Sequence, residues 1–79
     1  MNEQTLLEYG LRELVSFRAD MRTVTGMNEG YTRRIIAARL RDVLRSANAR
    51  REAAGLTRDQ AERACVLAAK AERKAVHAR

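Results

Sequence analysis

Arginine side chains recur along one side of the segment 31–54, which the sequence predicts to be a helix. Arg34, Arg41 and Arg45 are separated by seven and four residues, so a helix places them in one row, which Asn48 continues. A guanidinium group binds phosphate oxygens and guanine edges through its planar fork, and an asparagine amide pairs with adenine. The row therefore predicts a surface for duplex nucleic acid.

A second group of cations lies in the last third of the chain. Arg63, Lys70 and Lys74 share one side of a predicted helix over residues 58–77. If this helix packs beside the helix 31–54, the two basic groups join into one surface. Proteins that bind single strands stack bases on several aromatic rings. Only Tyr9 and Tyr31 could serve here, so the composition favours duplex DNA.

The alternative explanation is that these cations are only the solvated side of amphipathic helices, where charged residues are expected. The chain has a net charge of +6 and a large excess of arginine over lysine, which a GC-rich genome also produces. Asp42 and Glu52 interrupt the positive field of the middle helix. The positive charge therefore limits the class of partner and does not identify it.

Tyr31 and Ile35 point away from the main apolar stripe of the middle helix and lie about one turn apart. Exposed apolar neighbours of this kind indicate a partner interface. Single exposed apolar residues are also common and need no function. We expect these two residues to anchor either a second copy or an acidic protein partner.

Catalysis and metal binding have little support in the sequence. Cys65 and His77 are the only cysteine and the only histidine, and together they cannot complete a zinc site. Cys65 has apolar neighbours, as expected of a cysteine buried between helices. Gly26 and Gly30 are not followed by the residues of a phosphate-binding loop. We expect no enzyme activity, no metal and no cofactor.

The elements that must position these residues are three helices, at about residues 3–24, 31–54 and 58–77, within one domain. The chain has 79 residues, no proline and only four glycines, which favours an all-α fold. Apolar residues recur at helical spacing in each segment. Asn28 or Thr32 could cap the second helix, and Gly55 suits the left-handed position after its end.

The third helix has the clearest beginning. Thr57 is its N-cap, and Gln60 completes a capping box. The surrounding segment 50–61 resembles the part of helix-turn-helix repressors where the first helix ends and the second begins. In that family a glycine turn and a recognition helix follow. Here no turn residues follow Ala61, so the likeness covers twelve residues and concerns helix boundaries, not membership.

Alanines recur along the third helix at steps of three and four residues, namely at Ala61, Ala64, Ala68, Ala71 and Ala75. Such a seam lets two helices approach closely but buries little area. We expect the second and third helices to form an antiparallel hairpin, with Leu40, Val43 and Leu44 opposite the seam. Gly10 in the first helix predicts another close approach. This three-helix bundle leaves apolar stripes uncovered, which predicts a homodimer.

Two functions follow as expectations. The first is a small nucleic-acid-associated protein, such as a DNA-binding regulator or accessory factor. The second is a non-enzymatic adaptor or inhibitor that binds another protein, of the kind that phages and other mobile elements encode. No apolar run reaches the ~20 residues that span a bilayer, and no signal peptide is visible, so we expect a cytoplasmic protein that does not contact membranes.

Overall fold

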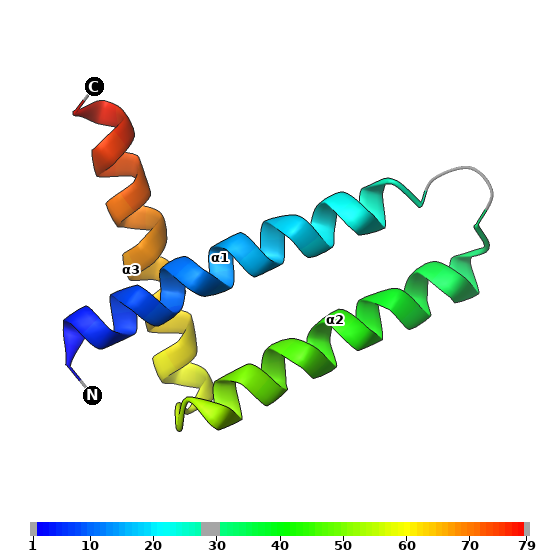
Figure 1. Ribbon diagram of the computed structural model, residues 1–79, viewed down its shortest axis with the longest axis horizontal. Coiled ribbons are helices and arrows are strands. Elements are labelled where there is room, and N and C mark those ends of the chain that lie inside the picture. The colour runs from blue at the N-terminus through cyan, green and yellow to red at the C-terminus, as the bar shows by residue number, and fades with distance from the viewer. Residues whose placement is uncertain (1, 28–30, 79) are drawn as a thin grey trace.

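The computed structural model describes residues 2–27 and 31–78, which form three α-helices and contain no strand (Figure 1). These are α1 (Glu3–Thr25), α2 (Arg33–Ala53) and α3 (Arg58–His77). The predicted all-helical fold with three helices is confirmed. Within the described ranges, no helix is both long enough and apolar enough to cross a membrane.

Local sequence signals explain where α2 ends and α3 begins. The backbone N–H of Thr57 donates to the Gln60 side chain at 2.9 Å, and the N–H of Gln60 donates to the Thr57 hydroxyl at 3.2 Å. This is the predicted capping box, which satisfies two N–H groups that the first turn leaves unpaired. Gly55 has a φ of 73°, the left-handed conformation that glycine adopts without steric cost.

The helix α2 begins two residues later than the sequence analysis placed it. Thr32 is its N-cap, and its hydroxyl accepts the N–H of Ile35 at 3.3 Å. Asn28, the other predicted cap, lies outside the described residues. At the start of α1, the side chain of Asn2 accepts the N–H of Thr5 at 2.9 Å. Each helix therefore begins directly after a residue with a short polar side chain.

The core lies where α3 crosses α1 (Figure 1). Ala64 and Ala68 of the alanine seam are completely buried there. A β-carbon at Gly10 would overlap the backbone carbonyl of Ala64, so the two helices touch through their backbones. The close approach predicted from Gly10 is confirmed. The remaining buried core residues are Leu6, Tyr9 and Leu56.

The alanine seam therefore packs on α1 and not on α2, which differs from the predicted hairpin of the second and third helices. The Cα atoms extend 43 × 34 × 14 Å, so Figure 1 looks down the thin direction and shows the helix directions almost undistorted. In this view α2 and α3 meet at the turn around Gly55 and then diverge. Glycine in α1 allows a closer approach than the branched side chains of α2 do, which explains the choice of partner.

The helix α2 runs antiparallel to α1 and is only loosely attached to it (Figure 1). None of its residues is buried. Its main polar connection to α1 is between Arg50 and Glu13, whose side chains form two hydrogen bonds of 2.8 and 3.0 Å. The molecule is thus a compact α1–α3 crossing from which α2 extends with most of its surface in solvent.

Candidate nucleic-acid interface

The arginine row (Arg34, Arg41 and Arg45) lies on the outer side of α2. At about 100° per residue, all three lie within about 20° of the direction opposite Val43. Val43 lines a cavity between α2 and α1, together with Leu14 of α1. The row therefore points away from α1, and all three arginines are exposed.

The guanidinium groups of the row are not paired internally. Among residues 2–27 and 31–78, no carboxylate lies within 4.0 Å of any of the three. Other arginines differ: Arg18 binds Glu72 at 2.9 Å and Arg50 binds Glu13 at 2.8 Å. The charge of the row is consequently directed to solvent, where an anion can reach it.

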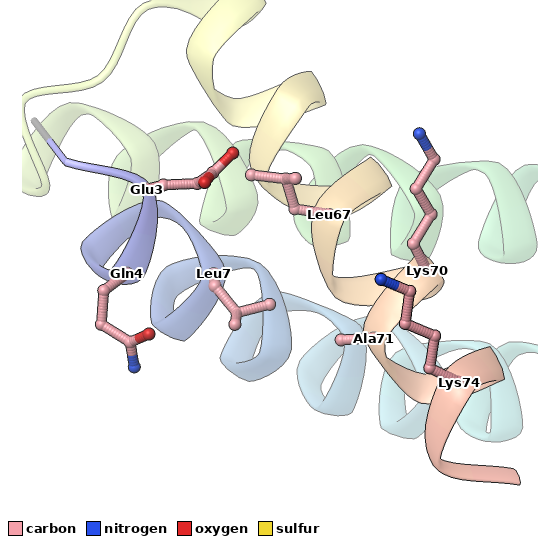
Figure 2. A pocket seen from close by; sticks show the side chains of 7 residues that line it. All are labelled: Glu3, Gln4, Leu7, Leu67, Lys70, Ala71 and Lys74. Atoms are coloured by element: carbon pink, nitrogen blue, oxygen red, sulfur yellow. The ribbon is translucent and has the colours of Figure 1, made fainter. Parts of the chain in front are cut away.

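The basic residues of α3 lie beside the N-terminal turn of α1. Lys70 and Lys74 are exposed and border an open cavity of about 340 Å³, which Glu3, Gln4, Leu7, Leu67 and Ala71 also line (Figure 2). Arg63 lies 3.8 Å from the Glu3 carboxylate, and both side chains are mostly exposed. Arg63 is thus partly neutralised, while Lys70 and Lys74 are exposed, and Figure 2 shows both lysine side chains extending from α3.

The two basic groups do not join within one chain. Their predicted fusion required α2 and α3 to pack side by side, and these helices diverge (Figure 1). The arginine row faces away from α1, whereas Lys70 and Lys74 flank the beginning of α1. The structure therefore presents two separate cationic surfaces, of which the row on α2 is the more regular.

The other predicted residues occupy different surroundings. Asn48 is exposed and belongs both to the end of the row and to the edge of a cavity of about 500 Å³ against α3. Tyr31 and Ile35 expose 53% and 46% of their surface at the beginning of α2. Both side chains are therefore accessible, at the end of α2 that lies away from the turn around Gly55.

Three side chains at or near the Glu13–Arg50 pair have shifted pKa values. The hydrogen bonds from Arg50 to Glu13 raise the pKa of the guanidinium. Burial, and secondarily the negative charge of Glu13, raise the pKa of the Cys65 thiol and of the Tyr9 phenol. A thiol whose pKa is raised stays protonated at neutral pH, so Cys65 lacks the activation of a nucleophile.

The sequence analysis did not predict the Glu13–Arg50 pair. Glu13 lies on the side of α1 that faces α2, and Arg50 lies on the side of α2 that faces α1. Opposite charges at such positions of two antiparallel helices are the signal that could have identified the pair. Arg51 was missed too: its guanidinium donates to the backbone carbonyl of Leu56 at 2.9 Å and stabilises the turn before α3.

Within the described parts of the chain, no three His, Cys, Asp or Glu side chains gather as metal ligands would. Comparisons with models of protein families, with curated proteins and with solved structures found no match. The geometry of the chain itself is thus the basis for assigning a function.

Proposed function

We propose that this chain is a small nucleic-acid-associated protein, a DNA-binding regulator or accessory factor that acts as a homodimer in the cytoplasm. The observation that carries the proposal is the arginine row, which is exposed, directed away from α1 and not neutralised by any described carboxylate. The second cationic surface, at Lys70 and Lys74, adds to the attraction for a polyanion.

The row suits a duplex in length as well as in charge. Arg34 and Arg45 are eleven residues apart, about 16 Å along a helix that rises about 1.5 Å per residue. Duplex DNA carries about one negative charge per 1.7 Å of its axis, so this span faces several phosphates. In this proposal the arginines neutralise phosphates and release condensed cations, and Asn48 at the end of the row pairs with a base edge.

The test is a titration of duplex DNA, followed by fluorescence anisotropy, at several salt concentrations. The slope of log K against log salt changes by about 0.9 for each phosphate contact. We expect a triple variant, R34A/R41A/R45A, to bind weakly and to lose about three of these contacts. A wild-type protein that does not bind duplex DNA at about 50 mM salt would exclude the proposal.

A matched variant controls for net charge. Arg12, Arg22 and Arg73 are exposed and lie outside the row, so R12A/R22A/R73A removes the same three charges elsewhere. We expect this control to retain most of the affinity. If the two triple variants lost the same affinity, DNA would be attracted by the net charge of the protein and would not bind a specific site on α2.

A second candidate function is that of an adaptor or inhibitor that binds an acidic protein. The exposure of Tyr31 and Ile35 favours it, because tyrosine and arginine are enriched at the centres of protein interfaces and exposed apolar residues beside them extend such a surface. A stoichiometric protein partner whose binding survives high salt, and is lost in Y31A/I35A, would support this function over DNA binding.

A further inference from the structure

One face of the α1–α2 layer carries an apolar trough, on the side where α3 lies. Its floor and walls come from all three helices, and two adjoining cavities of about 310 and 500 Å³ occupy it. Glu13, Ala47 and Cys65 line both cavities, and the charged side chains of Asp20 and Arg50 border the smaller one. The apolar trough is defined by the residues Leu14, Phe17, Val43, Ala47, Cys65 and Val66.

Large apolar side chains remain in solvent along the trough. Phe17 exposes 55% of its surface and Val66 exposes 53%. Leu44, on the α2 turn before Ala47, exposes 63%, and Leu40, one turn earlier, exposes 38%. Four large apolar side chains on or beside the trough thus remain exposed in a single chain, which is the kind of surface that marks an interaction site in soluble proteins.

The opposite face of the same two helices is polar. The cavity there shares Asp20, Val43 and Arg50 with the smaller cavity of the trough, and its other lining residues are all polar, namely Arg39, Asp42 and Ser46. The two faces of the layer thus differ as the inside and the outside of a folded protein do. The α3 side of the layer has the composition of a buried face without being buried in one chain.

The total surface area indicates how much of the chain remains to be covered. A compact monomer of 8.9 kDa exposes about 4,800 Å², whereas this chain exposes 6242 Å². The difference is about 1,400 Å², and each partner in a stable homodimer buries about 1,000 Å² or more. The radius of gyration, 14.7 Å, likewise exceeds the ~11.6 Å expected for a compact chain of this length.

The stability of α2 points in the same direction. In folded proteins a helix gains most of its stability from tertiary packing of an apolar face, and α2 has no buried residue of its own. Its burial must therefore come from another molecule. We propose that the apolar trough is where a second copy of this chain packs, the same face of each copy meeting the other across a two-fold axis. This proposal rests on the proposed homodimer and specifies its interface, and it does not require DNA binding.

The charges at the rim favour a second copy over a different partner. Arg58 and Glu62 both border the trough, both are exposed, and neither has an ion-pair partner within 4.0 Å in the described chain. A two-fold axis can set Arg58 of one copy against Glu62 of the other. A uniformly acidic or basic partner would match only one of the two signs.

The experiment measures the molar mass by light scattering, without nucleic acid and at high salt, so that its result is independent of the proposed DNA binding. We expect twice the chain mass of 8.9 kDa for the wild type. We also expect a Tm that rises with protein concentration, as mass action requires for a folded dimer. A wild-type monomer whose Tm does not depend on concentration would overturn the proposal, even if another protein bound the trough.

Variants locate the surface. Leu44→Asp places a charge beside the trough, on the α2 turn before Ala47, at a side chain that one chain leaves 63% exposed, so it spares intrachain packing. We expect L44D to lose the dimer, with at least a hundredfold weaker association. Val15→Asp is the matched control, because Val15 is 67% exposed and lies about 160° around α1 from Phe17. A dimeric L44D, or a V15D that dissociates as readily, would show that the interface lies elsewhere.

Discussion

Gly10 of α1 lies directly against the backbone carbonyl of Ala64 in α3, so the central crossing of the fold has no room for a side chain at position 10. A β-carbon there would also stand 3.0 Å from the β-carbon of Ala68. Because the obstacle is largely backbone, a side-chain rotation cannot relieve it. The crossing of α1 and α3 is thus the most sterically specific contact in the molecule.

Gly10→Ala is accordingly expected to destabilise the protein. Alanine favours a helix over glycine by about 1 kcal/mol, but the added methyl group forces the two helices apart. Overpacking of this kind costs about 1–3 kcal/mol, and here it also uncovers Leu6 and Tyr9. Urea unfolding followed by circular dichroism, at a fixed protein concentration, measures the free energy of unfolding. We expect a net loss of about 2 kcal/mol.

Gly26→Ala is the matched control for this substitution. A β-carbon at Gly26 would lie 3.4 Å from the carbonyl oxygen of Arg22, which is ordinary van der Waals contact, and its φ of −70° suits alanine. We expect a change within about 0.5 kcal/mol of the wild type. If G10A and G26A had the same free energy of unfolding, position 10 would not lie in a close contact between α1 and α3.

The Glu13–Arg50 pair is expected to hold α2 against α1. The Glu13 side chain is 14% exposed and that of Arg50 is 39% exposed, so water screens this pair less than it screens a surface pair. A double-mutant cycle with E13Q and R50Q should yield a coupling of about 1–2 kcal/mol.

The Arg18–Glu72 pair has similar geometry at a more exposed place, with side-chain exposures of 55% and 36%. A double-mutant cycle with R18Q and E72Q should yield a coupling energy of less than about 1 kcal/mol. A coupling energy at Arg18–Glu72 that equals or exceeds that at Glu13–Arg50 would contradict the role assigned to the partly buried Glu13 carboxylate.

Stability should decline in alkaline solution. The pKa of Cys65, ordinarily 9.0, and that of Tyr9, ordinarily 10.0, are both raised in the folded chain, mainly by burial. The folded state therefore retains these protons at a pH where the unfolded state has begun to release them. The stabilisation is complete below pH 9 and decreases as the pH rises through the folded pKa values.

Substitutions at the two residues separate their contributions. Cys65→Ala should make the decline of the unfolding free energy that begins near pH 9 less steep. Tyr9→Phe should do the same for the decline that begins near pH 10. The measurement is urea unfolding at a series of pH values. Slopes that are the same in wild type and C65A/Y9F would show that other groups cause the decline.

The capping box predicts a specific loss at the beginning of α3. Thr57→Ala removes the acceptor for the Gln60 N–H and should cost about 1 kcal/mol of stability. Thr57→Ser keeps the hydroxyl and should recover most of it. If T57S were as unstable as T57A, packing of the threonine methyl group, and not the hydrogen bond, would account for the loss.

Much of the local structure could be predicted from the sequence. The three helices follow from apolar periodicity and the lack of proline, and the start of α3 follows from Thr57 and Gln60. The glycine at position 10 correctly indicated a close helix approach. The helices and their caps depend on residues a few positions apart, whose interactions do not require knowledge of the rest of the fold, whereas Gly10 indicated a close approach without identifying the partner helix.

The choice of packing partners could not be predicted in the same way. The alanine seam suits any helix that can come close, and nothing within it distinguishes α1 from α2. The sequence analysis paired it with Leu40, Val43 and Leu44, whereas in the structure it packs on α1 at Gly10. The predicted union of the two basic surfaces depended on that pairing and was not found.

By itself, the sequence determined the helices, their caps and the row of arginines on one side of the middle helix, because each follows from the helical repeat and from neighbouring side chains. Only the tertiary structure decided that α3 crosses α1, that Arg50 meets Glu13 and that one face of the layer holds an uncovered apolar trough. These depend on how near two distant segments can approach, which is a property of their combined shapes.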